Sequence, residues 1–415
     1  MAMASIVTVG NEILSGYVVN TNTAYLAGKL LETGVCVVSE HTAGDEEEAI
    51  IKALRLAADE ADLIIVTGGL GPTEDDLTRE ALARFLETEL ELDKKLLQKI
   101  EGIFRGRGIS MSANNKRQAF IPKGATAIAN IIGTAAGIRA EWKGKIIFVM
   151  PGVPYEMKLM FEKSILPEIK KIQDKKGGVK VIRKINCFGE GESKIAEMLG
   201  DLGSRERNPQ INYTVDCGTV TIHITTTGRD RKEAEELADK DEKNITKRLG
   251  KLIFSKGDLS LEEVVGELLV QKGKTIATAE SCTGGLLAKM ITDAAGASRY
   301  FLQGWVTYSN SAKIKELGVE ADIIERNGAI SEETAAAMAK GARQKSGADY
   351  TIAITGIAGP EGGSEQKPVG LVFISVDSEG GTDTKKFVFR GDRASIRKRA
   401  AKTALNLLRL KLQID

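Results

Sequence analysis

The chain has few of the residues on which many hydrolases depend. Its 415 residues include only two histidines, His41 and His223. Catalytic triads that use histidine as a base, and zinc sites built on histidine, are therefore not expected. Any hydrolytic reaction would have to rely on serine, lysine, tyrosine, carboxylates or added cations.

Cysteine and long apolar runs are also scarce. The four cysteines, Cys36, Cys187, Cys217 and Cys282, are scattered without the spacing of a metal site, which is typical of reduced thiols in a cytosolic protein. No apolar run approaches membrane-spanning length, and residues 1–10 lack the basic-then-apolar layout of a signal peptide. We expect a cytoplasmic protein with no membrane partner.

The chain also lacks an excess of charge of either sign. The 58 basic and 57 acidic residues give a formal net charge of +1, which argues against a global nucleic-acid binder. The hydrophobic fraction of 42%, the charged fraction of 28% and the 44 glycines indicate a turn-rich globular protein of the α/β class. A chain of this length exceeds one ordinary core, so two or three domains are expected.

Alternating apolar and helical segments predict an α/β multidomain protein with three parts. Residues 1–169 read as strands separated by helices, which predicts a parallel sheet that binds ligands at the carboxyl ends of its strands. Residues 170–256 begin with a charged segment, 170–178, expected to be a linker, and continue as a small α+β domain. Residues 257–415 return to alternating α/β structure.

The segment 278–285 (TAESCTGG) is the most informative stretch of the chain. It joins an apolar strand-like run to the helix-like run 286–293, so Ser281 is expected at a strand-to-helix turn. Main-chain N–H groups around Thr283, Gly284 and Gly285 could then hold an oxyanion or a phosphate beside a nucleophile. The alternative is an ordinary turn with a capping hydroxyl.

Two residues further along could activate that serine. The predicted strand 301–308 ends at Tyr308, and Lys313 follows five residues later. A desolvated lysine can be neutral and can deprotonate a serine, while the tyrosine passes the proton or orients the amine. Each residue also has an ordinary interpretation, a packed strand aromatic for Tyr308 and a solvated helix residue for Lys313.

Two later segments suggest ligand contacts. Residues 355–360 (TGIAGP) follow a buried strand and would present the Thr355 hydroxyl and the Gly356 backbone to a small ligand, unless the loop is ligand-free. Arg393 is expected at the start of the last helix, where its planar guanidinium could meet a phosphate. Ten basic residues against one acid in 385–411 predict a solvated face, with nucleic-acid contact as the alternative.

A second candidate site lies in the N-terminal part, in residues 66–76 (VTGGLGPTEDD). Glycines allow main-chain N–H groups to approach a diphosphate, and carboxylates can hold a hard divalent cation that a pyrophosphatase would need. The alternative is an acidic helix start that complements the helix dipole. The glycines are Gly68, Gly69 and Gly71, and the carboxylates are Glu74, Asp75 and Asp76.

These motifs, in this order, resemble the CinA family of competence/damage-inducible proteins over essentially the whole chain. Besides 278–285 and 66–76, the resemblance rests on five further motifs. They are 10–16 (GNEILSG), 150–157 (MPGVPYEM), 306–310 (VTYSN), 355–363 (TGIAGPEGG) and 391–393 (GDR).

The resemblance implies an N-terminal domain like molybdopterin-binding proteins, a KH-like middle domain and a C-terminal nicotinamide mononucleotide (NMN) deamidase domain, in a homodimer. It assigns catalysis to Ser281, Tyr308 and Lys313. The implied reaction converts NMN to nicotinic acid mononucleotide and ammonia and requires no cofactor. The N-terminal domain is expected to bind or hydrolyse ADP-ribose. A non-catalytic nucleotide-sensing scaffold for competence or DNA repair is the alternative function.

The resemblance also extends the N-terminal site. Asp76 matches the aspartate of the molybdopterin-binding motif, Asp45 matches a second aspartate, and Asn20 stands where many members carry aspartate, which puts turnover there in question. A divalent cation (Mg²⁺, Mn²⁺ or Co²⁺) is expected at Asp75 and Asp76, and K⁺ is a further candidate. The segment 188–193 (FGEGES) resembles the middle-domain signature and predicts a turn in a spacer or dimerisation element, because its glutamates would repel nucleic-acid phosphates.

Overall fold

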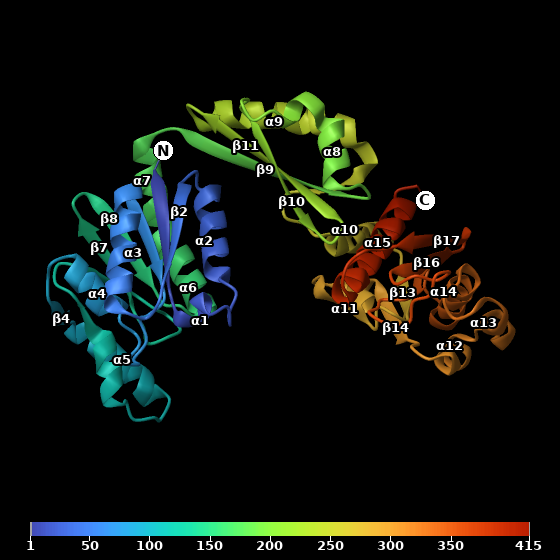
Figure 1. Ribbon diagram of the computed structural model, residues 1–415, viewed down its shortest axis with the longest axis horizontal. Helices are drawn as coiled ribbons and strands as arrows, with labels where there is room; N and C mark the ends of the chain where they lie inside the picture. Colours follow the sequence, from blue (N-terminus) through green and yellow to red (C-terminus); the bar gives the residue numbers. More distant parts are fainter. Residues whose placement is uncertain (1, 415) are drawn as a thin grey trace. The chain divides into compact units, whose positions relative to one another are not determined.

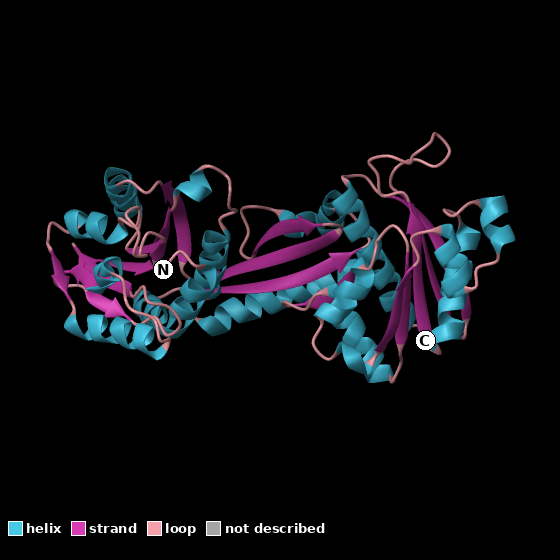
Figure 2. Ribbon diagram, turned by 90° about the horizontal axis from the view of Figure 1, so that it is seen from below, coloured by secondary structure: helices cyan, strands magenta, loops and turns pink. Residues whose placement is uncertain are grey.

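The computed structural model describes residues 2–414 and divides the chain into two compact units. One unit comprises Met1–Ile182 with Thr226–Leu237, and the other comprises Arg183–Thr225 with Ala238–Asp415. Helices and strands alternate through both units, and strands gather into sheets flanked by helices (Figures 1 and 2). The predicted multidomain α/β class is confirmed.

A six-stranded sheet forms the centre of the N-terminal domain, in the order β2-β1-β3-β8-β7-β6. The first four of these strands are parallel, and the last two run antiparallel to their neighbours. The parallel strands therefore end together at one edge. The strands are β1 (Met3–Val9), β2 (Cys36–Ala43), β3 (Leu63–Thr67), β6 (Thr126–Ile128), β7 (Gly137–Trp142) and β8 (Lys145–Met150).

Helices cover both faces of this sheet, because its strands present apolar side chains alternately to either side. Helices α3 and α4 pack on the face that carries Val7 and Val66. Helices α2, α6 and α7 pack on the face that carries Ile6 and Ile65, and α2 and α3 lie on opposite sides of the sheet in Figure 1. The helices are α1 (Asn11–Leu14), α2 (Thr21–Glu32), α3 (Glu47–Glu60), α4 (Thr78–Phe85), α6 (Pro154–Met160) and α7 (Leu166–Lys176).

Two features differ from the sequence-based expectations. The segment 170–178, expected to be a linker, is mostly the end of α7, because Ile169 and Gln173 on its inner face are buried. Residues 86–144 carry structure that the hydrophobic pattern did not reveal. It comprises β4 (Leu90–Leu92), α5 (Lys94–Gly106), a 3₁₀ helix at Ala113–Ala119 and β5 (Phe120–Pro122), besides β6 and β7.

The middle segment forms a four-stranded sheet in the order β10-β11-β9-β12. The predicted turn at residues 188–193 is confirmed, since β9 ends at Phe188 and α8 begins at Glu192. Strand β10 was not predicted. The elements are β9 (Val179–Phe188), α8 (Glu192–Leu199), β10 (Gln210–Asp216), β11 (Thr219–Gly228), α9 (Arg231–Leu249) and β12 (Ile253–Lys256).

The C-terminal domain is built on a five-stranded sheet in the order β14-β13-β15-β16-β17. Strands β14, β13 and β15 are parallel, whereas β16 and β17 are antiparallel. Strand β13, the middle one of the three parallel strands, ends immediately before Ser281. The strands are β13 (Ile276–Glu280), β14 (Phe301–Val306), β15 (Tyr350–Gly356), β16 (Leu371–Ser378) and β17 (Gly381–Val388).

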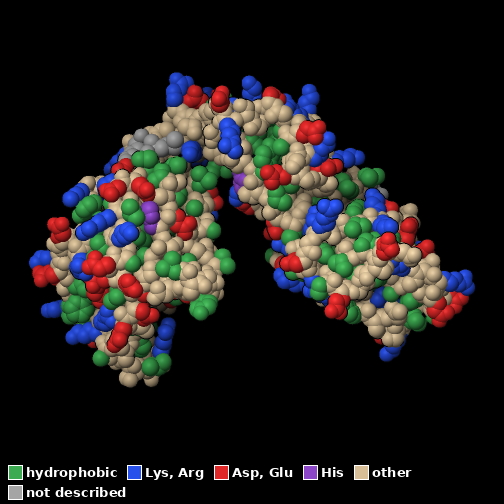
Figure 3. Space-filling model, in the orientation of Figure 1, with side chains coloured by type: hydrophobic (Ala, Val, Ile, Leu, Met, Phe, Trp, Pro, Cys, Tyr) green, Lys and Arg blue, Asp and Glu red, His purple; other side chains and the backbone are tan. Residues whose placement is uncertain are grey.

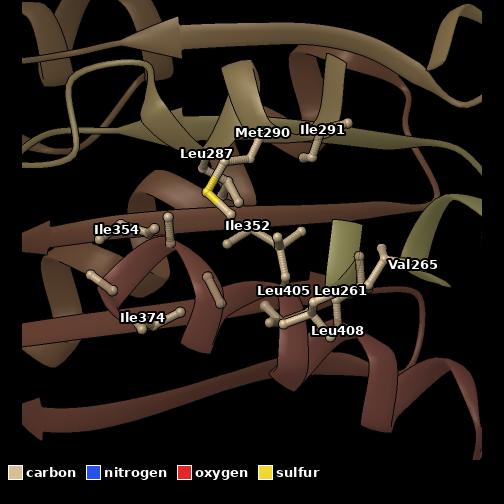
Figure 4. Packing of buried hydrophobic residues seen from close by; sticks show 14 of the residues in the cluster. Leu261, Val265, Leu287, Met290, Ile291, Ile352, Ile354, Ile374, Leu405 and Leu408 are labelled. Atoms are coloured by element: carbon tan, nitrogen blue, oxygen red, sulfur yellow. The ribbon is translucent and has the colours of Figure 1, made fainter. Parts of the chain in front are cut away.

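Helices also cover both faces of the C-terminal sheet. Helices α10, α11 and α15 pack on the face that carries Ile352, Ile354 and Ile374, and Figure 4 shows their leucine, valine, isoleucine and methionine side chains pointing toward these isoleucines. Helices α12, α13 and α14 cover the other face around Ala353. The helices are α10 (Leu261–Lys272), α11 (Leu286–Asp293), α12 (Asn310–Leu317), α13 (Ala321–Asn327), α14 (Glu332–Ser346) and α15 (Arg393–Leu412).

Acidic and basic side chains are interspersed on the face shown in Figure 3, in keeping with the nearly balanced charge of the chain. Within residues 2–414 no helix combines the length and the apolar character that crossing a bilayer would require.

Candidate functional site

Ser281 lies in a sharp turn between β13 and α11. Strand β13 is fully buried, and the main-chain N–H of Ser281 donates to the carbonyl of Ile354 at 2.9 Å, which fixes the turn to β15. Gly284 and Gly285 have φ angles of +57° and +90°, in the left-handed region that favours glycine. The turn thus brings the serine, which is only 9% exposed, to the end of the sheet.

Lys313 reaches this serine from α12. Its Nζ donates to Oγ of Ser281 at 3.2 Å and to the carbonyl oxygens of Thr307 at 2.8 Å and Tyr308 at 3.4 Å. Helix α12 is capped by Ser309, whose hydroxyl accepts from the N–H of Ala312. The cap starts the helix just after β14 and places Lys313 in its first turn, pointing back at the serine.

Burial makes this lysine a candidate base. Lys313 is 1% exposed, and desolvation lowers the pKa of its ammonium group from the usual value. A buried ammonium with neutral hydroxyl and carbonyl partners loses its proton more readily than a solvated one. The solvated-helix interpretation of Lys313 is therefore wrong.

Tyr308 occupies a different position from its two proposed partners. Its side chain is 62% exposed, and its phenol oxygen accepts a hydrogen bond from Nη2 of Arg393 at 3.1 Å. It meets Lys313 through its main-chain carbonyl, not through the phenol. The carbonyl can orient the amine, whereas the phenol lies with the arginine at the mouth of the site.

A cavity of about 250 Å³ joins these residues. Its wall includes six of the residues named from the sequence, whereas Thr283, Gly284 and Gly285 lie outside it. The hydroxyl of Thr355 donates to the carbonyl of Ala329 at 2.7 Å, and Arg393 donates to the carbonyl of Gly359 at 2.7 Å. The six residues are Ser281, Tyr308, Lys313, Thr355, Gly356 and Arg393.

Two charged side chains brace the serine turn and were not identified from the sequence. The carboxylate of Glu280 is 0% exposed and accepts from the N–H groups of Leu287 and Ala288 in the first turn of α11. Arg397 donates to the carbonyl of Thr283 from α15. Glu280 could have been identified as a charged residue in an otherwise uncharged strand. Arg397 could have been identified by its spacing of one helical turn from Arg393.

Cys282, next to the serine, is a second potential nucleophile in the cavity wall. Burial raises the pKa of its thiol to about 11, so the thiol is protonated at neutral pH. The serine with its lysine is therefore the better nucleophile.

The basic segment 385–411 is less solvated than expected. Lys402 is buried and donates to the carboxylate of Asp216 at 2.8 Å, and Lys398 donates to the same carboxylate at 2.9 Å. Arg409 is 0% exposed and donates to main-chain carbonyls of residues 251 and 253. Much of the basic excess therefore stabilises the structure instead of forming a solvated face.

The candidate N-terminal site is a cavity of about 540 Å³ at the carboxyl ends of β1, β3 and β8. Its wall brings together all six residues predicted for substrate binding, and Asp75. Glu12 and Glu156 line it as well and were not singled out from the sequence, although both lie inside conspicuous motifs. The predicted residues are Asn20, Asp45, Gly68, Gly69, Gly71 and Asp76.

Asp76 holds the glycine loop in shape. Its Oδ1 accepts from the N–H of Gly71 at 2.7 Å, and its Oδ2 accepts from the N–H of Thr73 at 2.9 Å and from the Thr73 hydroxyl. The Arg79 guanidinium donates to the carbonyls of Leu70 and Gly71 from the other side. The carboxylate oxygens of Asp76 are thus engaged by the loop itself.

Negative charge accumulates in this cavity. Burial raises the pKa of Asp45, and the neighbouring carboxylates of Glu12, Asp75 and Asp76 raise it further. A cation would relieve this repulsion, so the residues fit one. Within residues 2–414 no three His, Cys, Asp or Glu side chains form a ready metal cluster. A Mg²⁺-like ion would therefore be held by one or two carboxylates together with the ligand's phosphates.

Asn20 caps α2 and is tied into the fold. Its Oδ1 accepts from the N–H of Thr23 at 3.0 Å, and its Nδ2 donates to the Thr8 and Thr23 hydroxyls and to Glu40 at 2.9 Å. An aspartate here could still accept the cap bond, but it would face the Glu40 carboxylate without a donor. The Asn20 amide therefore supplies a donor to Glu40 that an aspartate would lack.

Three family models match successive parts of the chain. The model described as the CinA C-terminal domain matches residues 258–412, and the one described as the CinA KH domain of damage-inducible proteins matches residues 182–255. The model described as a probable molybdopterin binding domain matches residues 5–171.

Relatives match over nearly the full length. A "CinA-like protein" of Kosmotoga olearia is 43% identical over 406 residues, and a "putative competence-damage inducible protein" of Clostridium beijerinckii is 44% identical over 407 residues, each with 98% of both chains covered. A solved structure of a CinA protein of unknown function from Thermoplasma acidophilum is 35% identical and covers 40% of this chain and 98% of its own, with a TM-score of 0.38. The full-length identity shows that the chain belongs to the CinA family.

Proposed function

We propose that the C-terminal domain hydrolyses the carboxamide of NMN to nicotinic acid mononucleotide and ammonia. The observation that carries this proposal is the 3.2 Å hydrogen bond from Nζ of Lys313 to Oγ of Ser281. The lysine is buried and its pKa is lowered, which supports its use as a base. Two histidines in the whole chain leave few other bases for acyl transfer.

The reaction proceeds through an acyl-enzyme. Neutral Lys313 accepts the Ser281 proton as Oγ attacks the carboxamide carbon. The C–N bond then breaks, the protonated lysine returns its proton to the leaving nitrogen, and ammonia departs. Water then gives a proton to the same lysine and attacks the ester carbon. The bond from carbon to Oγ breaks, the lysine returns the proton to Oγ of Ser281, and the nicotinic acid mononucleotide leaves, losing its own carboxyl proton to solvent.

Main-chain N–H groups of the serine turn stabilise the oxyanion in this proposal. Gly284 already donates its N–H to the carbonyl of Ser281 at 3.0 Å. Of the expected donors, Thr283 and Gly285 remain, but neither lines the cavity, so the carboxamide oxygen would have to approach the turn beyond the cavity wall to reach their N–H groups.

The volume of the cavity and the charge beside it also support NMN as the substrate. Its volume of about 250 Å³ is at the small end for ligand sites, so the pyridine ring would enter and the ribose phosphate would stay near the mouth. Arg393 lies there beside the exposed Tyr308 ring. A guanidinium that already donates to Gly359 and Tyr308 retains further N–H groups for phosphate.

The test is ammonia release by the purified full-length chain, with NMN compared against nicotinamide and nicotinamide riboside. The proposal expects turnover of NMN and much weaker turnover of the two compounds without phosphate. Absence of ammonia release from NMN at any pH from 6 to 10 would contradict it and would favour the non-catalytic nucleotide-sensing scaffold.

A second function is proposed for the N-terminal domain, the binding of ADP-ribose and its metal-dependent cleavage at the diphosphate. The carrying observation is the cavity of about 540 Å³ in which a glycine loop faces several carboxylates. Main-chain N–H groups of residues 68–71 suit a diphosphate, and Asp45 and Asp75 would hold a divalent cation with it. The cation would neutralise phosphate charge.

The N-terminal proposal is tested by calorimetric titration of ADP-ribose with and without Mg²⁺, followed by product analysis. Binding that requires the cation supports the site, and release of AMP supports turnover. Tight binding without turnover would support only the binding function, for which Asn20 is a candidate reason. Absence of binding in both conditions would contradict the proposal.

A further inference from the structure

Glu280 is the charged residue closest in sequence to the nucleophile, and it lies on the protein side of the serine turn. It ends the buried strand β13, is 0% exposed and immediately precedes Ser281. Its Oε2 accepts from the N–H of Leu287 at 2.9 Å, and its Oε1 accepts from the N–H of Ala288 at 2.8 Å. Both oxygens of a buried carboxylate are thus engaged by the first turn of α11.

This arrangement takes the place of an ordinary cap. Helix α11 begins after Gly285, which offers no side-chain hydrogen bond. The first N–H groups of a helix are unpaired within it and carry the positive end of the helix dipole. Here a carboxylate from the preceding strand pairs two of them across the turn 281–285, so both ends of the turn are held by one residue.

The main chain of Glu280 extends the same support to the base. Its carbonyl accepts from the N–H of Thr307 at 2.8 Å, and the Thr307 carbonyl accepts from Nζ of Lys313 at 2.8 Å. Ser281 and Lys313 are therefore both positioned from one point, the end of β13.

We propose that Glu280 is a positioning residue for deamidation: its side chain holds the serine turn, and its main-chain carbonyl supports the segment that pairs with the base. This inference rests on the proposed function of the C-terminal domain. Glu280 and the N–H groups of Leu287 and Ala288 lie outside the cavity wall, so Glu280 acts through Ser281 and Lys313 and not on the substrate itself.

Two substitutions separate position from charge. Glu280→Gln keeps the length but removes the charge and turns an NH₂ group toward a main-chain N–H. Glu280→Asp keeps the charge but is one methylene too short to reach both N–H groups. A matched control is Glu263→Gln in α10, since the Glu263 carboxylate also pairs a main-chain N–H, that of Ser260 at 2.7 Å, in a capping box.

The kinetic test uses the full-length chain with NMN as substrate. Glu280→Gln should lower kcat about 10- to 100-fold, because a small displacement of reacting groups has this effect, with KM within about 3-fold. Glu280→Asp should also lower kcat with KM nearly unchanged, and Glu263→Gln should change neither constant.

A measurement that does not involve substrate accompanies the kinetics. Hydrogen exchange at the N–H groups of Leu287 and Ala288 should become faster in Glu280→Gln, and it should stay at the native rate in Glu263→Gln. A native kcat in Glu280→Gln, or unchanged exchange at α11, would overturn the inference. If the native chain does not deamidate NMN, the proposed function fails, and the exchange rates alone then decide whether Glu280 holds the turn.

Discussion

The two candidate sites use buried charge in opposite ways. In the C-terminal site a lysine is buried against a hydroxyl and two carbonyls, and desolvation lowers its pKa. In the N-terminal site Asp45 is partly buried among other carboxylates, and burial together with their charge raises its pKa. Both environments favour the neutral form of the group.

The consequence differs, because a neutral lysine is already a base, whereas crowded carboxylates gain most from a cation. Cys282 adds no charge to the first site, and Arg393 lies at its mouth. The second site contains Glu12, Asp45, Asp75 and Asp76 over a glycine loop. The C-terminal chemistry should therefore be complete in the protein, whereas the N-terminal chemistry should depend on an added ion.

The largest effect on activity is expected when the nucleophile is removed. Ser281→Ala should lower NMN deamidation by on the order of 10⁴-fold or more, because acyl transfer without its nucleophile loses most of its rate. Ammonia release measures it. Binding of ADP-ribose and the circular dichroism spectrum should stay native in this variant. Near-native ammonia release would instead favour direct attack by an activated water.

The next largest effect is expected from a substitution that removes the base but keeps its positive charge. Arginine stays protonated in proteins, so Lys313→Arg should lower kcat by about 10²- to 10⁴-fold. Lys313→Met, which keeps the apolar stem and removes the amine, is the companion variant and should be as inactive. Substantial activity in the arginine variant would mean that Lys313 is only an electrostatic or structural residue.

Removing divalent metal should separate the two sites in one protein preparation. Chelation should abolish metal-dependent binding or cleavage of ADP-ribose and leave ammonia release from NMN unchanged. Asp76→Ala should weaken ADP-ribose binding about 10-fold or more, because three hydrogen bonds that shape the glycine loop are lost. Loss of both activities on chelation, or of neither, would contradict the assignment of separate chemistries to the two domains.

The lowered pKa of Lys313 also predicts a pH dependence of stability. The unfolded chain binds the lysine proton up to the ordinary pKa near 10.5, whereas the folded chain releases it at lower pH. Between these two values the unfolded state binds more protons, so the free energy of unfolding should rise with pH. The slope is at most about 1.4 kcal/mol per pH unit.

Denaturant unfolding of the native chain and of Lys313→Met at several pH values from 7 to 10.5 measures this effect. The native chain should gain stability relative to the variant as pH rises. Deamidation by the native chain should rise over the same range, because the neutral amine is the base. A difference in stability that does not change with pH would show that Lys313 keeps its ordinary pKa.

The elements around the C-terminal site were predicted better from the sequence than those of the N-terminal domain, because the length of the elements in the two regions differs. Residues 276–308 alternate between a buried strand, a glycine turn and an amphipathic helix, and α11 was predicted with its correct bounds, Leu286–Asp293. Residues 86–144 contain strands of three residues, which are too short to show a periodic pattern, and the amphipathic helix α5 was missed although its apolar spacing is clear. Three-residue strands such as β4 and β5 depend on pairing with each other.

Hydrogen bonds made across the glycine turns could not be predicted from the sequence either. Glu280 could be seen as a charge in an apolar strand, but its partners follow seven and eight residues later, across a turn of unknown shape. Asp76 was predicted as a metal ligand, and the structure adds that its oxygens accept from the main-chain N–H groups of the glycine loop. In both cases the main-chain N–H groups exposed by a glycine turn determined the partner, and only the folded backbone reveals them.

The smallest expected effect concerns the residue beside the nucleophile. Cys282 lines the same cavity as Ser281, and burial raises the pKa of its thiol to about 11. At neutral pH the thiolate fraction is then negligible, and only the thiolate is nucleophilic. Cys282→Ala should therefore retain NMN deamidation within about 3-fold, and iodoacetamide at pH 7 should leave the native chain active. If alkylation abolishes ammonia release and Cys282→Ala protects against it, the thiol is more reactive than its burial implies, and the contrast between a C-terminal site where burial favours neutral groups and an N-terminal site of crowded carboxylates would be weakened.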